Sequence, residues 1–85
     1  MARYRIEVKK SAAREISRIP KRDLTLILAR IQALADNPRP PGSVKLTGEE
    51  KYRIRQGSYR ILYTIEDDVL TVCVVKIAHR KDAYR

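Results

Sequence analysis

The first apolar residues of the chain alternate with charged ones. Tyr4, Ile6 and Val8 are separated by Arg5 and Glu7. A period of two is typical of a strand that buries one of its faces. The sequence therefore predicts that this part of the chain forms a β-strand.

The spacing of apolar residues then changes to that of a helix. Ala12, Ile16 and Ile19 fall on one helical face, Ser11 precedes them as a candidate N-cap, and Pro20 marks the end of the segment. A short helix capped by Ser11 is therefore predicted.

A second helix is predicted directly after the first. Apolar residues recur there at intervals of three and four over about four turns. They are Leu24, Ile27, Leu28, Ile31 and Leu34. Residues 36–42 follow with three prolines and a glycine, which end helices, so this stretch is expected to be a connector.

After the connector the period returns to two. Strands are predicted over residues 44–46, 51–56, 59–65 and 69–77, with tight turns at 56–58 and 66–68. Two amphipathic helices can cover one face of a small sheet. We therefore predict a single α+β domain over residues 1–85, with two helices on one face of a small, twisted, mainly antiparallel sheet and the order β-α-α-β-β-β. The other face of the sheet is expected to stay open.

Arginines mark the predicted hairpin around Gly57. Arg53 and Arg55 share one strand face by alternation, but Arg60 joins them only in one register of the hairpin. A plain three-residue loop would put Arg60 on the opposite face. We predict that Arg55 pairs with Arg60 across a turn of four residues, which gathers the three arginines on the open face.

The net charge points to a negatively charged partner. Nineteen Lys and Arg residues stand against ten Asp and Glu residues, which gives a formal net charge of +9. Such an excess on a small domain favours nucleic acid or a strongly acidic protein as partner. A generally basic, soluble surface is the alternative explanation.

Several kinds of site are not expected. One histidine and one cysteine without clustered carboxylates cannot supply a closed zinc shell, so no metal or cofactor is predicted. Cys73 lies in an apolar run and is expected to act as a small core residue. No apolar stretch reaches the roughly 18 residues of a membrane span, and the expected compartment is the cytoplasm.

With these motifs in this order, the chain resembles the RelE/ParE superfamily of toxins from bacterial and archaeal toxin–antitoxin modules. The resemblance covers nearly the whole chain, from the opening strand and paired helices to the connector. It continues through Lys45-Leu46, residues 52–63 and the ending at residues 79–84. The RelE-like branch fits best.

The resemblance implies a function and a site. RelE-type toxins cleave messenger RNA in the ribosomal A site without a metal, by attack of a ribose 2′-hydroxyl on the adjacent phosphate. The positions that match the RelE catalytic pattern are Arg53, Arg55, Arg60, Arg80 and Tyr84. Guanidinium groups can hold the phosphate and stabilise its developing charge. Further RNA contacts are expected from Lys45, Lys51 and Lys81.

The chain departs from the best-known RelE pattern at Arg53 and Arg55, where lysines are expected. Lysine can release a proton when other cations crowd it, whereas arginine stays protonated. Another group would then have to transfer the proton. His79 is the first candidate, because its ordinary pKa is near neutrality and it adjoins Arg80. A surface histidine at a strand end is the alternative.

The resemblance also implies partners. An acidic antitoxin is expected to cover the basic toxin, which allows a toxin–antitoxin hetero-oligomer. Messenger RNA in the ribosomal A site and ribosomal RNA are the other expected partners, and no membrane is. Two further functions stay open, namely a ParE-type toxin that poisons gyrase without cutting RNA, and an inactive homologue that only binds antitoxin.

Overall fold

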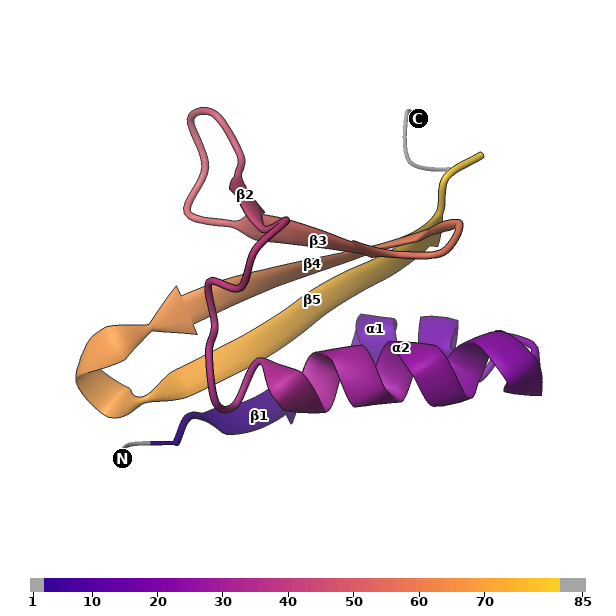
Figure 1. Cartoon of the computed structure of the whole chain (residues 1–85), viewed down its shortest axis with the longest axis horizontal. Coiled ribbons are helices and arrows are strands. Elements are labelled where there is room, and N and C mark those ends of the chain that lie inside the picture. Colours follow the sequence, from indigo (N-terminus) through magenta and orange to yellow (C-terminus); the bar gives the residue numbers. More distant parts are fainter. Residues whose placement is uncertain (1–2, 82–85) are drawn as a thin grey trace.

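The computed structural model describes residues 3–81, and these form a five-stranded sheet with two helices on one face (Figure 1). The strand order is β1-β5-β4-β3-β2. β1 runs parallel to β5, and the other neighbouring pairs are antiparallel. The predicted α+β architecture is confirmed. The strands are β1 (Arg5–Val8), β2 (Val44–Lys45), β3 (Tyr52–Gln56), β4 (Tyr59–Glu66) and β5 (Thr71–His79).

The first helix, α1 (Lys10–Ile16), begins earlier than predicted. Lys9 still belongs to the parallel ladder, because its N–H donates to the Val74 carbonyl at 2.8 Å. Its own carbonyl accepts the first helical hydrogen bond from Ala13 N at 2.9 Å. The helix therefore starts where strand pairing ends, and the predicted Ser11 cap is wrong. Ser11 lies inside the helix, which has no side-chain cap.

The second helix, α2 (Lys21–Ala33), follows Pro20, whose carbonyl accepts from Leu24 N at 2.9 Å. Ile27 and Ile31 are buried against the sheet, as predicted. Leu28 is 40% exposed, so the buried face of the helix is narrower than its apolar pattern indicated. No helix within residues 3–81 is both long enough and apolar enough to cross a membrane.

The core lies between the helices and the covered face of the sheet. It includes Ile54, Ile61, Val72 and Val74, which are fully buried, and each such side chain contributes about 1.5–3 kcal/mol on leaving water. Tyr63 is also fully buried, and its hydroxyl donates to the Pro38 carbonyl at 2.7 Å. Burial raises the pKa of this hydroxyl, which keeps it protonated as a donor.

The connector between α2 and β2 is fixed by a polar network. The Arg39 guanidinium donates twice to Asp67, at 3.2 and 3.0 Å, and once to the Tyr52 hydroxyl at 3.2 Å. The Tyr4 hydroxyl donates to the same carboxylate at 2.6 Å. These bonds join the connector to the opening strand and to the turn between β4 and β5.

The last strand begins later than predicted. Residues Asp67–Val69 form a 3-10 turn, and Leu70 adopts a left-handed conformation with a φ of 47°. The strand prediction over residues 69–70 is therefore wrong. An extra residue on β5, Val75, separates the pairs Tyr63–Val74 and Leu62–Lys76. This bulge keeps apolar residues on the covered face on both of its sides.

Cys73 lies on the open side of the sheet, opposite Thr64. The thiol is only partly buried, so the expectation of a core cysteine is corrected. Burial nonetheless raises its pKa, which disfavours the reactive thiolate.

Candidate functional site

The hairpin of β3 and β4 gathers three arginines on the open face. Arg55 lies directly opposite Arg60, and Arg53 lies opposite Leu62. Alternation places Ile54 and Ile61 on the other face, where they are buried. We call Arg53, Arg55 and Arg60 the sheet arginine row.

The predicted pairing of Arg55 with Arg60 is confirmed, but the turn is shorter than predicted. Gln56 pairs with Tyr59, so the loop contains only Gly57 and Ser58. Gly57 has a φ of 59°, a conformation that glycine adopts without strain and that two-residue hairpin loops require. The tight turn preserves the face on which each arginine lies.

Arg80 lies beside this turn. Its N–H donates to the Ser58 carbonyl at 2.7 Å, which extends the pairing of β4 and β5 by one position. Ala78, two residues earlier, lies opposite Arg60. Figure 1 shows the end of β5 next to the β3–β4 turn. Two distant parts of the sequence, the hairpin and residue 80, thus meet at one end of the sheet.

Arg55 and Arg60 place two like charges directly opposite each other on the open face. Like charges directly opposite each other destabilise an antiparallel pair. Within residues 3–81, no carboxylate forms an ion pair with Arg53, Arg55 or Arg80. The open face can therefore stabilise a bound phosphate, which supplies negative charge and several acceptor oxygens.

Apolar residues flank Arg53 on the open face. Leu62 lies opposite Arg53 on β4, and Val44 lies opposite it on β2 with 44% of its surface exposed. Alternation along β4 places Leu62 on the face of Arg60. No sequence pattern predicted that Val44, on the two-residue strand β2, would lie opposite Arg53.

The three predicted lysine contacts are dispersed. Lys51 directly precedes β3 and follows the alternation of Arg53, and its Nζ is 3.6 Å from Glu49 Oε1. Lys45 pairs with Tyr52, on the opposite face from Arg53, and its Nζ is 3.6 Å from Glu50 Oε2. Lys81 donates its backbone N–H to His79 Nδ1 at 3.2 Å. Tyr84 lies outside the described residues.

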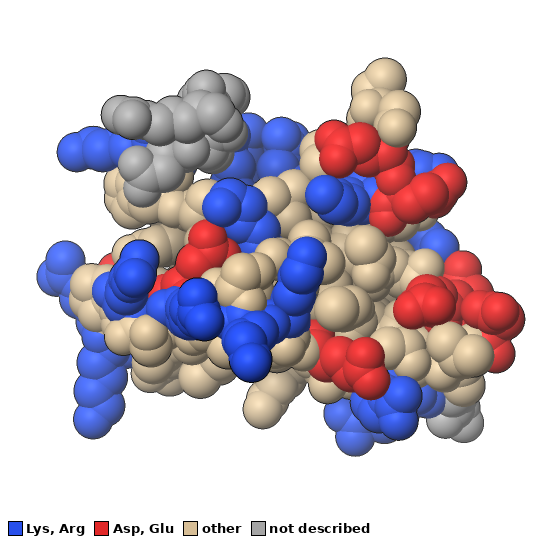
Figure 2. All heavy atoms as spheres, turned by 180° about the vertical axis from the view of Figure 1, so that it is seen from behind, with Lys and Arg blue, Asp and Glu red and all other residues tan. Residues whose placement is uncertain are grey.

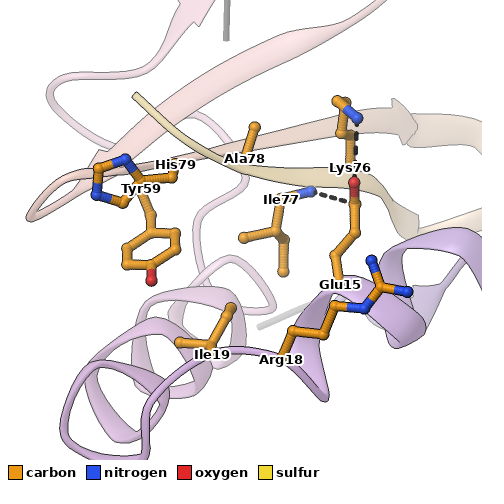
Figure 3. A pocket seen from close by; sticks show the side chains of 8 residues that line it. All are labelled: Glu15, Arg18, Ile19, Tyr59, Lys76, Ile77, Ala78 and His79. Carbon is orange, nitrogen blue, oxygen red and sulfur yellow. Dashed lines mark hydrogen bonds and ion pairs between the residues drawn. The ribbon is translucent and has the colours of Figure 1, made fainter. Parts of the chain in front are cut away.

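His79 is not brought to the arginines. It pairs with Tyr59, which shares the helix-covered side of the sheet with Ile61. The His79 and Tyr59 rings meet edge to face with their centroids 5.2 Å apart. Both side chains line a cleft of about 270 Å³ between α1 and β5 (Figure 3). The sheet therefore separates the imidazole from the sheet arginine row.

Comparison with known proteins identifies the family. A family model described as the ParE toxin of the type II toxin–antitoxin system parDE matches residues 4–84. The chain belongs to this family of toxins. The predicted RelE/ParE resemblance is confirmed.

Individual relatives carry RelE-type names. Toxin RelG of Mycobacterium tuberculosis is 32% identical, over 96% of this chain and 97% of its own. The putative toxin RelE1 of Methanocaldococcus jannaschii is 28% identical, over 98% and 97%. In the crystal structure of the toxin–antitoxin complex RelBE2 from M. tuberculosis, one chain matches with a TM-score of 0.84 and 28% identity, over 96% and 97%. The protein is thus a RelE-like toxin of a type II toxin–antitoxin module.

Proposed function

We propose that this toxin is a ribosome-dependent, metal-independent endoribonuclease that cuts messenger RNA in the A site. The observation that carries the proposal is the pairing of Arg55 with Arg60, which puts three guanidinium groups on one open face near Arg80. The similarity to toxins named RelG and RelE1 supports an activity of the RelE type.

The chemistry needs positive charge more than it needs a nucleophile from the protein. The ribose 2′-oxygen attacks the adjacent phosphorus, a 2′,3′-cyclic phosphate forms, and the bond to the 5′-oxygen breaks. Negative charge grows on the nonbridging oxygens, where guanidinium groups can donate paired hydrogen bonds. The 2′-hydroxyl loses a proton and the leaving 5′-oxygen gains one.

Arginine stays protonated, so the sheet arginine row stabilises charge and does not transfer the proton. We assign no proton transfer to His79, because it lies on the other side of the sheet. Tyr84 stays a candidate from the RelE pattern. Dependence on the ribosome follows if the ribosome holds the message in the in-line geometry that the toxin cannot impose alone.

The test adds purified toxin to translating ribosomes with a defined message and maps new 5′-hydroxyl ends. Arg60→Ala and Arg80→Ala should each slow cleavage by about 10²- to 10³-fold, as loss of a charge-stabilising donor does. Arg5→Ala is the matched control, because Arg5 lies on β1 and pairs with Glu7 at 3.1 Å. Unchanged cleavage in both site variants would refute the proposal.

A second function has its own support. The matching family model is named for ParE, and Arg53 and Arg55 occupy positions where RelE-type catalysis favours lysine. A gyrase supercoiling assay should run in parallel with the ribosome assay. Gyrase inhibition without RNA cleavage would establish the ParE-type function, and neither effect would indicate a homologue that only binds antitoxin.

We further propose an acidic antitoxin as the partner in the cell. The net charge of +9 and the similarity to a chain from a toxin–antitoxin complex support this. Co-expression with the product of the neighbouring gene should yield a complex that dissociates as salt concentration rises. A neighbouring product that leaves the toxin unbound at low salt would contradict it.

A further inference from the structure

Arg30 on α2 differs from most cations of the toxin. Most Lys and Arg side chains are exposed, and Figure 2 shows many of them on the face behind the view of Figure 1. The Arg30 side chain is half-buried. The connector passes beside its guanidinium, because a Cβ atom on Gly42 would lie 3.9 Å from Arg30 Nη2. Arg30 is thus a cation enclosed between a helix and a loop.

The charge of Arg30 is not paired within the chain. No carboxylate of residues 3–81 forms an ion pair with its guanidinium. A charge that has lost part of its hydration is normally paired with an opposite charge, because the loss of hydration is costly. Arg30 can therefore gain from a carboxylate that another molecule supplies.

Carboxylates on the helix side of the sheet are already bonded elsewhere. Glu15 on α1 lies with its Oε2 3.0 Å from Lys76 Nζ, and its Oε1 accepts a hydrogen bond from Ile77 N at 2.9 Å (Figure 3). Asp36, at the start of the connector, pairs with Arg3 at 3.1 Å. Each of these acidic side chains has a cation of its own.

One donor of the same guanidinium is unsatisfied. Arg30 Nε is buried and has no hydrogen-bond partner, and within residues 3–81 it is the only buried side-chain nitrogen or oxygen in this condition. Buried polar atoms in proteins nearly always have a partner, so an exception needs an explanation. A ligand that brings an acceptor oxygen to this donor would supply one.

The unsatisfied donor and an unfilled space lie on the same edge of the guanidinium. Nε and Nη2 form the edge that can donate two parallel hydrogen bonds to one carboxylate. Beside Nη2, Gly42 has no side chain to fill the space. A space of this size favours a small planar carboxylate over a bulkier phosphodiester. Within the described part of the chain, no hydrogen bond joins the turn at residues 40–43 to α2, so the turn can move to admit a ligand.

An exposed apolar side chain beside Arg30 indicates where the carboxylate comes from. Leu26 precedes Arg30 by four residues, so it lies on the same side of α2, and it is 55% exposed. A carboxylate that belongs to a protein chain brings neighbouring side chains that can cover Leu26. A small free anion cannot do so.

We propose that Arg30 and the turn around Gly42 form a carboxylate site, which receives an Asp or Glu side chain of an acidic protein partner. The site lies on the helix side of the sheet, away from the sheet arginine row, so it does not take part in the proposed cleavage. To name the antitoxin as this partner rests on the proposed function, whereas the site itself does not.

The first experiment uses the unmodified full chain, labelled with 15N, and follows the Nε–Hε resonances of its arginines by NMR. Sodium acetate replaces sodium chloride at constant ionic strength. The Arg30 resonance, assigned by its loss in Arg30→Gln, should shift and saturate with a Kd in the millimolar range, about 4 kcal/mol of binding free energy. Arg22, an exposed cation of the same helix, should show no saturable shift.

Two outcomes of this titration would overturn the proposal. The absence of a saturable shift at Arg30 would show that Nε bonds only to water. Dimethyl phosphate, which carries the single charge of an RNA phosphodiester, is the second titrant. If it saturates Arg30 at concentrations at least tenfold lower than acetate, the assignment to a carboxylate is wrong.

The second experiment measures the affinity of the toxin for the product of the neighbouring gene. Arg30→Gln should weaken the complex about 10- to 100-fold, as loss of hydrogen bonds to a charged group does. Arg22→Gln removes the same charge from an exposed position of α2 and should change the affinity by less than about threefold. Glutamine keeps the helix propensity at both positions.

The two experiments separate the site from the identity of the partner. If Arg30→Gln binds the neighbouring product as tightly as the unmodified toxin does, the assignment to a partner side chain is overturned. If no complex forms with the unmodified toxin, the antitoxin is refuted as the partner, and the acetate titration still supports or overturns the carboxylate site.

Discussion

The two faces of the sheet use the same strands for opposite purposes. On the covered face, Ile54 and Ile61 are fully buried under the helices. On the open face, their chain neighbours Arg55 and Arg60 lie directly opposite each other. Burial makes the first pair a source of stability. The second pair sets two like charges opposite each other, and a bound anion can offset their repulsion. Stability and function are thus assigned to alternate residues of one hairpin.

The largest expected effect on stability comes from the covered face. Ile61→Ala removes a fully buried side chain and should lower the free energy of unfolding by about 2–5 kcal/mol. Ile61→Val should cost about 0.5–1.5 kcal/mol and serves as the milder variant. Urea denaturation followed by circular dichroism measures both. If Arg60→Ala destabilises the protein as much as Ile61→Ala, the division between the faces fails.

The next effect concerns a polar group on the covered face. Tyr63→Phe leaves the ring in place but removes the hydrogen bond to the buried Pro38 carbonyl, so the expected loss is about 1–3 kcal/mol. Tyr4→Phe is the comparison, because its hydroxyl bonds to an exposed carboxylate. Thermal unfolding of the two variants should show a clearly larger decrease in Tm for Tyr63→Phe.

A smaller effect of opposite sign is expected on the open face. Arg55→Gln relieves the repulsion from Arg60 and should raise the free energy of unfolding by about 0.2–1 kcal/mol, while cleavage falls. The gain should shrink as salt screens the charges. Arg5→Gln, which breaks the pair with Glu7, should give no such gain. A destabilised Arg55→Gln protein would show that the row is not a charge cost.

The smallest effect depends on pH. Hydrogen bonds from Arg39, and then from Tyr4, hold the pKa of Asp67 below its usual value of 3.8. A depressed pKa stabilises the folded state above pH 3.8, and this contribution disappears as pH falls through the lower folded-state value. The difference in unfolding free energy between the unmodified protein and Asp67→Asn should therefore be present at pH 6 and decrease below pH 4. A difference independent of pH would contradict the network.

The sequence predicted the architecture because its signals were local. Alternation was enough to place Arg53 and Arg55 on one face, whereas the face of Arg60 depended on the register of the turn, which the sequence left open. Local signals failed where distant segments interact. Ser11 has the chemistry of a cap, but pairing of Lys9 with Val74 moves the start of the helix.

The position of His79 shows the same limit. Adjacency to Arg80 suggested a shared site, yet successive residues of a strand point to opposite faces. The bulge at Val75 also interrupts the alternation of side chains along β5, and no local sequence motif predicts it. The face of β5 on which His79 lies could therefore be known only from the register between β4 and β5.

The hydrogen bonds from β5 to Glu15 also protect an exposed edge of the sheet. β1 pairs with β5 only as far as Val74, so the later part of β5 is an edge of the sheet. An unpaired edge strand can pair with a strand of another molecule and start aggregation. There the Ile77 amide is already bonded to Glu15, and the charged Lys76 stands beside it. A second molecule that approaches this edge finds the Ile77 N–H already bonded and the charged Lys76 beside it. Both features disfavour strand pairing between two copies of the protein.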